Sequence, residues 1–133
     1  MFRTALAALA ILSAPAHAAE LVMFTQKGCV WCERFDREIA PLYEKTDEGK
    51  RAPLRRVDIA RPLPADLAFV ARDRFTPAFV LVDRGREFGR IRGYPGDTFF
   101  FGLLDNMIAQ LDRGESVTPD PDAAPPPGAT PAR

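Results

Sequence analysis

The chain has 133 residues, of which 18 are basic and 18 acidic, so its formal net charge at pH 7 is zero. Charges of both signs alternate along the sequence, without a basic stripe or an acidic block. Nucleic acid and anionic membrane surfaces are therefore disfavoured as partners, because both require a concentrated positive field.

The first 18 residues have the features of a secretory signal peptide. Arg3 precedes an apolar run from Ala5 to Leu12, and the small residues around His17 predict cleavage after Ala18. The run is shorter than the roughly 20 residues needed to cross a bilayer, so a retained anchor is the weaker alternative. We expect an exported protein with one folded domain, 19–115.

The lone histidine, His17, lies in the segment that we expect to be removed. The exported chain would then contain no imidazole, which excludes Ser-His and Cys-His catalysis and every metal site with a histidine ligand. The reactive side chains that remain are those of the two cysteines, Cys29 and Cys32.

An apolar run from Leu21 to Thr25 predicts the first strand, and a helix follows the turn at Gly28. Pro41 is expected to kink or end this helix. Its apolar positions recur at helical spacing: Cys32, Phe35, Ile39, Leu42 and Tyr43. Leu54–Ile59 predicts a second strand and Ala65–Arg72 a short helix.

Ala78–Val82 and Glu87–Ile91 predict an antiparallel hairpin that turns at Arg84-Gly85. A last helix is expected to begin with Asp97 as its N-cap and to stop at Gly114. Its apolar stripe is Phe100, Leu103, Leu104, Met107, Ile108 and Leu111. Residues 116–133 are rich in proline and lack periodicity, which predicts a disordered or extended tail.

The two cysteines lie where the first strand passes into the first helix. Side chains three residues apart on a helix are neighbours, within reach of a disulfide. Cys29 would stand at the helix N-terminus, where unpaired N–H groups and the helix dipole favour a thiolate. Cys32 would be more buried. The pattern predicts a redox pair in which Cys29 attacks a partner and Cys32 resolves the mixed disulfide.

Three other interpretations of the cysteine pair are weaker. A purely structural disulfide is disfavoured, because so short a loop removes little entropy from the unfolded chain. Two thiolates make at most half of a zinc site. Covalent haem attachment needs a histidine after the second cysteine, where this chain has Glu33. We therefore expect no metal and no cofactor beyond the disulfide, and a redox-inert binding module remains the non-enzymatic alternative.

The cysteine motif, together with Phe75-Thr76-Pro77 before a strand, resembles the thioredoxin superfamily. The resemblance implies an α/β thioredoxin fold, with a four-stranded mixed sheet flanked on both faces by about three helices. It also implies that Pro77 is cis and lies beside Cys29. The backbone of Thr76 would pair with a bound partner, and Gly93 would let the partner's backbone approach.

From Leu21 to about Leu111 the chain is similar to the SoxS-type periplasmic thioredoxins of bacterial sulfur-oxidation systems. The similarity is carried by Phe24–Cys29, Ile39–Pro41, Thr46–Gly49, Phe75–Asp83 and Gly93–Gly96. It implies a periplasmic reductant that keeps the cysteine of a sulfur-carrier protein active and is recharged by a membrane thiol transporter. A general periplasmic thioredoxin, or one serving cytochrome c maturation, is the alternative.

The chain departs from general thioredoxins at the motif itself. Val30-Trp31 stands where they have Gly-Pro, and Met23 where they bury a carboxylate that helps deprotonate the resolving cysteine. Another base, or water, must therefore serve here. Trp31 is expected to be a partly exposed residue of the docking surface. The span from Cys32 to Pro77 leaves no room for an inserted helical domain, and we expect a monomer.

Overall fold

The computed structural model describes residues 19–117, which form one mixed β-sheet with helices packed against it. The strands lie in the order β2-β1-β3-β4. They are β1 (Ala19–Thr25), β2 (Leu54–Asp58), β3 (Ala78–Asp83) and β4 (Arg86–Arg92). β2 runs parallel to β1, and β3 runs antiparallel to both β1 and β4. The predicted α/β class and four-stranded mixed sheet are confirmed.

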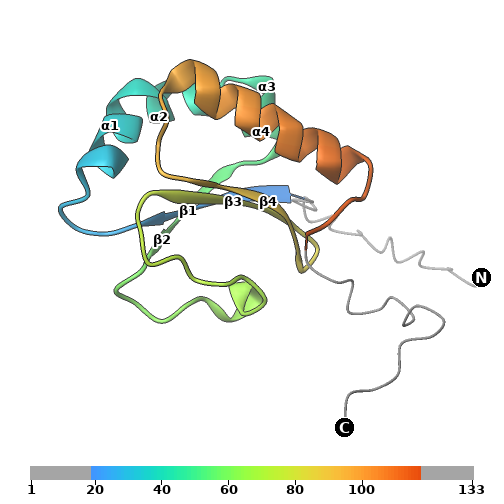
Figure 1. The fold of residues 1–133 in the computed structure, drawn as a ribbon, viewed down its shortest axis with the longest axis horizontal. Helices are drawn as coiled ribbons and strands as arrows, with labels where there is room; N and C mark the ends of the chain where they lie inside the picture. The colour runs from blue at the N-terminus through green and yellow to red at the C-terminus, as the bar shows by residue number, and fades with distance from the viewer. Residues whose placement is uncertain (1–18, 118–133) are drawn as a thin grey trace, which may run out of the picture.

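The four α-helices lie on one face of this sheet (Figure 1). They are α1 (Val30–Glu38), α2 (Ala40–Tyr43), α3 (Asp47–Arg51) and α4 (Asp97–Asp112). The other face is covered by the connection between β2 and β3, which contains one 3₁₀ turn, η1 (Ala65–Leu67). The two faces therefore bury separate apolar clusters, and the helix expected on the second face is present only as the 3₁₀ turn η1.

The helix predicted at Ala65–Arg72 is reduced to η1 because its second half is bound to β4. Leu67 and Val70 are buried against the sheet, but the carbonyl of Ala71 accepts a hydrogen bond from Arg90 of β4. Asp73 then forms ion pairs with Arg90 and Arg92. These contacts hold the chain along β4 instead of letting it continue as a helix.

The first helix is interrupted where Pro41 predicts a break. α1 ends at Glu38, Ile39 lies between the helices, and Pro41 occupies the first turn of α2. Ile39 and Tyr43 are buried as expected. Leu42 is exposed, because the break between α1 and α2 changes which side of the helix faces the sheet. The short helix α3 that follows was not predicted.

The structure can be compared with the predicted ends of the last helix, α4, and with the predicted turn between β3 and β4. Gly96 is the N-cap of α4, not Asp97, whose carboxylate instead accepts a hydrogen bond from the N–H of Thr98. Gly114 ends the helical segment with φ = +72°, as predicted. Arg84 and Gly85 both have positive φ, at 44° and 74°, as a type I′ hairpin turn requires.

Aromatic rings in tilted and edge-to-face contact join α1 and α4 to the sheet. Phe35 of α1, Phe79 of β3 and Phe100 of α4 are fully buried, and their ring centroids lie 4.7 to 5.2 Å apart. Burial of such rings contributes on the order of 2–3 kcal/mol each. This packing fixes the start of α1, and with it the two cysteines, relative to the strand ends.

The predicted signal peptide (1–18) lies outside the described residues, as does the predicted tail (116–133) apart from its first two residues. The N–H of Val117 donates to the carbonyl of Glu87 at 2.7 Å. In residues 19–117 no helix is long and apolar enough to span a bilayer.

Candidate active site

Cys29 and Cys32 are joined by a disulfide at the start of α1, with their Cα atoms 5.2 Å apart. Gly28, with φ = +75°, turns the chain from β1 into the helix. Cys29 is the N-cap of α1, and its Sγ accepts a hydrogen bond from the N–H of Cys32 at 3.1 Å. The first sulfur therefore lies at the positive end of the helix, where a thiolate is stabilised.

The two cysteines differ slightly in accessibility. Cys29 is 7% exposed and Cys32 is 3% exposed, in the same core cluster as Phe35 and Ile39. This order agrees with an attacking Cys29 and a resolving Cys32, and the two catalytic roles stay predictions. Met23 is fully buried in the same cluster, and its thioether cannot act as the base that the resolving step needs.

The structure brings the predicted docking residues to the end of the sheet that carries Cys29. The Thr76–Pro77 peptide bond is cis, as the resemblance implies. Phe24 pairs with Ala78, so Pro77 lies beside the end of β1, from which the chain passes to Cys29. Gly93 has φ = +85° and donates its N–H to the carbonyl of Pro77 at 2.8 Å. Thr76, Pro77 and Gly93 thus lie together.

Trp31 lies between the cysteines and is 53% exposed, as predicted for a residue at the edge of a docking surface. The Arg34 guanidinium carbon lies 5.7 Å from the centre of the Trp31 ring and 5.9 Å from that of Tyr94. A cation at this distance is attracted to the ring face. Arg34 therefore links the exposed tryptophan to the more buried tyrosine.

The orientation of Arg34 is fixed by a carboxylate that sequence reasoning missed. Glu38 accepts one hydrogen bond from Arg34 and one from the Tyr94 hydroxyl, both at 2.8 Å. These two bonds hold the pKa of Glu38 below its usual range. Burial and the bond to Glu38 raise the pKa of Tyr94 to about 12. The spacing of Arg34 and Glu38 on one helix was the available signal, but the contact with Tyr94 is visible only in three dimensions.

Phe75, next to the cis peptide, is a second surface residue whose role was not predicted. Its side chain is 77% exposed. The neighbouring hydroxyl of Thr76 is buried and has no hydrogen-bond partner. Large exposed apolar side chains beside a reactive group are typical of a protein-docking surface.

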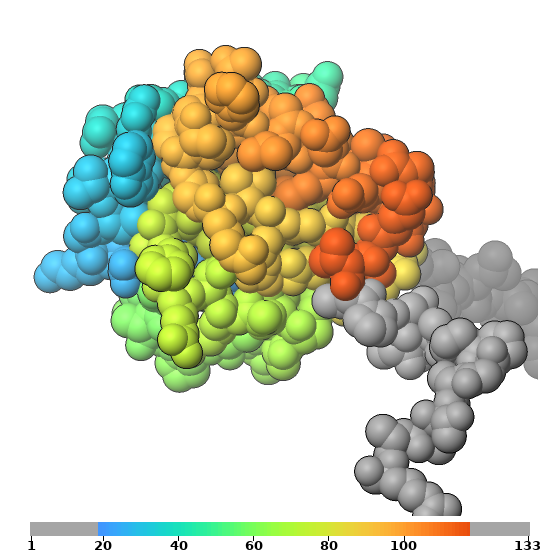
Figure 2. All heavy atoms as spheres, in the orientation of Figure 1, coloured from blue at the N-terminus to red at the C-terminus, as the bar shows by residue number. Residues whose placement is uncertain are grey.

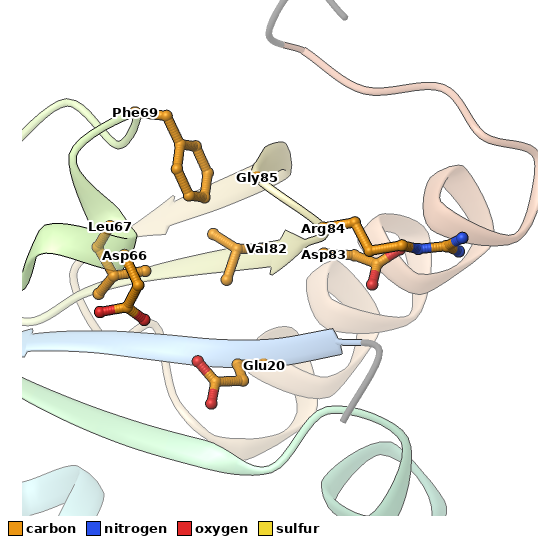
Figure 3. A pocket seen from close by; sticks show the side chains of 8 residues that line it. All are labelled: Glu20, Asp66, Leu67, Phe69, Val82, Asp83, Arg84 and Gly85. Atoms are coloured by element: carbon orange, nitrogen blue, oxygen red, sulfur yellow. The ribbon is translucent and has the colours of Figure 1, made fainter. Parts of the chain in front are cut away.

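A pocket of about 280 Å³ lies elsewhere, between the start of β1, η1 and the β3–β4 turn (Figure 3). Its acidic residues are already paired, because Glu20 and Asp66 bind Arg55 while Asp83 binds Arg84. Within residues 19–117 no three His, Cys, Asp or Glu side chains are grouped so that they could hold a metal ion. The disulfide therefore remains the candidate reactive centre.

Comparisons with known proteins agree with this geometry. No protein-family model and no curated protein matches the chain. Among solved structures, the periplasmic thioredoxin SoxS from Paracoccus pantotrophus, in its reduced form, is 46% identical. The match covers 70% of this chain and 98% of that one, with a TM-score of 0.67.

Two further solved structures support the fold alone. The thioredoxin of Malassezia sympodialis is 19% identical with a TM-score of 0.51, over 69% of this chain and 79% of that one. The thioredoxin of Fasciola hepatica is 18% identical with a TM-score of 0.52, over 68% of this chain and 82% of that one.

With its redox disulfide at a helix N-terminus, the chain is a thiol-disulfide oxidoreductase that belongs to the thioredoxin superfamily, in the family of SoxS.

Proposed function

We propose that this protein is a periplasmic reductant that restores the active cysteine of a sulfur-carrier protein in a bacterial sulfur-oxidation system. The observation that carries the proposal is the Cys29–Cys32 disulfide, with Cys29 Sγ capping α1. The 46% identity with a periplasmic SoxS, over almost all of that chain, supports the compartment and the class of partner.

The proposed reaction transfers two electrons and two protons. In the reduced protein, the Cys29 thiolate attacks one sulfur of the partner's disulfide, which forms a mixed disulfide and releases the partner's other sulfur as a thiolate. Cys32 gives up its thiol proton to water or to the released partner thiolate, and the resulting Cys32 thiolate attacks the Cys29 sulfur, which releases the carrier's cysteine as a thiolate that takes up a proton from water. The products are the oxidised Cys29–Cys32 pair and two partner thiols.

The cycle requires a reductant that returns Cys29–Cys32 to the dithiol. We assign this role to a membrane thiol transporter that delivers electrons to the exported protein. The proposal needs neither a metal nor a further cofactor, because thiol–disulfide exchange uses only sulfur atoms. It takes the protein to be a monomer that is exported by removal of residues 1–18.

The reduction potential of the chain from residue 19 to 133 tests the direction of electron flow. Equilibration with defined thiol buffers is expected to give roughly −230 to −270 mV, the range of reductants such as glutaredoxins and thioredoxin. A value near −120 mV is typical of a strong oxidant and would rule out the repair of a carrier cysteine.

A Cys32→Ser variant tests whether the pair turns over at all. Without the resolving thiol, the mixed disulfide between Cys29 and the carrier should accumulate and be visible on non-reducing gels. A redox-inert binding module would form no such adduct. Trapping of cytochrome c maturation proteins in preference to the sulfur carrier would favour the alternative function.

A further inference from the structure

Asp83, the last residue of β3, is a buried carboxylate with an incomplete set of partners. Its side chain is 2% exposed. One oxygen, Oδ2, accepts a hydrogen bond from Nε of Arg84 at 3.1 Å, but that arginine is 78% exposed. The other oxygen, Oδ1, is buried and has no hydrogen-bond partner within residues 19–117. A buried charge is costly unless it is paired and its hydrogen bonds are made, so a further donor at Oδ1 would stabilise the fold.

The residue directly opposite Asp83 on the neighbouring strand is Ala19, the first residue of β1. The Cα atoms of opposite residues in antiparallel strands are about 4.5–5.5 Å apart. Ala19 belongs to the apolar cluster under the α-helices, as does Leu81, two residues before Asp83. Since side chains alternate along a strand, Asp83 and Ala19 lie on the same face of the sheet. Figure 3 shows Asp83 close to the start of the pale-blue strand β1.

The other charged groups at this end of the fold have partners of their own. Arg86, opposite Asp83 on β4, places its guanidinium carbon 5.3 Å from the centre of the Phe88 ring. The ion pairs here are Glu20 with Arg55, Glu87 with Arg90, Asp112 with Arg51, and Glu115 with Arg113. None of these side chains donates a hydrogen bond to Asp83 Oδ1.

Removal of residues 1–18 changes the chemical nature of Ala19. In the uncleaved chain its nitrogen is part of a neutral peptide bond. Hydrolysis of the bond between Ala18 and Ala19 by water leaves a carboxylate on the released leader and an amine on Ala19, which is protonated at neutral pH because its ordinary pKa is about 8. The ammonium is one bond of about 1.46 Å from the Cα of Ala19. A rotation of this terminal residue therefore brings an N–H within reach of Asp83.

We propose that the ammonium of Ala19, created by cleavage after Ala18, binds the buried carboxylate of Asp83 and completes the fold. The inference rests on one part of the proposed function, the removal of residues 1–18, and goes beyond its thiol chemistry. The precursor has a neutral amide at this position, so it lacks the ion pair and is less stable than the mature chain. The fold reaches its full stability only after the leader is removed.

This site lies at the end of the sheet opposite to the disulfide. β1 begins at Ala19, and its other end leads to Cys29. The N–H of Val117 donates to the carbonyl of Glu87, so the last described residues mark the same end of the sheet as Asp83. In Figure 2 these residues, in orange-red, lie across the molecule from the blue segment that leads into α1. Changes at Asp83 are therefore expected to leave the reactivity of Cys29 unchanged.

The test compares two oxidised proteins. One is the chain 19–133 with a free amine on Ala19, and the other is the same chain preceded by a Gly-Ser dipeptide, which restores a peptide bond at Ala19 and moves the ammonium away. At pH 7 the first chain should have a thermal unfolding midpoint higher by about 5 °C or more, measured by circular dichroism.

The pH dependence of this difference identifies the amine as its source. An ion-paired ammonium has a raised pKa in the folded state. Its contribution is therefore fully present below the unfolded-state value of about 8 and is lost as the pH rises through the folded-state value. Titration of the Ala19 amine by NMR should give a pKa above about 9. An amine that titrates near 8 would contradict the ion pair.

Two variants assign the effect to Asp83. Asp83→Asn removes the negative charge and should abolish the difference between the two chains. Glu20→Gln is the matched control, because Glu20 is next to Ala19 in sequence but its carboxylate binds Arg55, and here the difference should remain. Equal midpoints for the two chains, or a difference that survives in Asp83→Asn, would overturn the inference. A mass of the exported protein that places its N-terminus elsewhere than at Ala19 would overturn it as well.

Disulfide reduction separates this inference from the proposed function. Both chains and both variants should reduce a disulfide-linked protein substrate at the same rate, because the ion pair lies far from Cys29. If the chain 19–133 reduces no disulfide although its unfolding midpoint depends on Asp83 as expected, the proposed function fails and the ion pair stands.

Discussion

Gly49 of α3 offers a sharp test of how the helical layer is packed. A Cβ built at this position would lie 1.8 Å from the carbonyl oxygen of Tyr43, well inside the separation of about 3.5 Å at which dispersion contacts are optimal. That oxygen also accepts hydrogen bonds from the N–H and the hydroxyl of Thr46, at 3.0 and 2.8 Å. The clash must therefore be relieved by moving backbone, which also strains the buried Tyr43.

Replacing Gly49 by alanine is expected to lower the free energy of unfolding by about 3 kcal/mol, the upper range for overpacked sites. Urea unfolding of the oxidised protein, followed by circular dichroism, measures this change as a shift of the midpoint at constant slope. The matched control is Gly102→Ala, on the exposed side of α4, where a Cβ meets nothing within 4 Å. Alanine should stabilise that helix by about 0.5–1 kcal/mol. If Gly49→Ala lowers the free energy of unfolding by less than about 1 kcal/mol, the contact between Gly49 and the Tyr43 carbonyl is not as tight as the structure shows.

Two other substitutions test polar groups near the site. Thr76→Val removes a buried hydroxyl without a hydrogen-bond partner and should raise the free energy of unfolding of the oxidised protein by up to about 1 kcal/mol. A decrease of that size, measured by urea unfolding, would contradict this prediction. Asp73→Asn should cost about 1–3 kcal/mol at pH 7, because Arg90 is nine-tenths buried and loses a charged partner. The pKa of Asp73 is lowered in the folded state. The ionised carboxylate therefore stabilises the fold at pH values above its unfolded-state pKa of about 3.9, and this contribution is lost as the pH falls through its folded-state pKa. The difference in the free energy of unfolding between wild type and Asp73→Asn should therefore become smaller as the pH falls from about 5 to 2. A difference that stays constant over this range would contradict the prediction.

Strand positions and turn chemistry were predictable because short-range rules dominate them. The apolar runs of β1 and β3 are long enough to identify buried strands, and Arg84-Gly85 marks a two-residue turn. The cysteine pair was equally predictable from the sequence, because side chains three positions apart at the start of a helix are neighbours. Local sequence therefore accounts for the sheet and for the disulfide.

The missed features depend on contacts between distant segments. The helix predicted after Pro64 ends early because Arg90 of β4 binds the carbonyl of Ala71, and helical periodicity carries no information about that bond. α3 has only five residues, too few for a periodic pattern, and its signal was the N-cap Thr46 bonded to the N–H of Gly49. The Glu38–Tyr94 bond joins residues 56 positions apart.

The position of Cys29 as N-cap has a practical consequence for the design of inactive variants. Its sulfur is both the reactive atom and the acceptor for the N–H of Cys32. Serine at this position retains an oxygen that can accept the same bond, whereas alanine leaves the helix without a cap, at a cost of about 1 kcal/mol. Cys29→Ser is therefore the cleaner redox-dead protein, and a defect seen only in Cys29→Ala reports on the start of the helix and not on electron transfer.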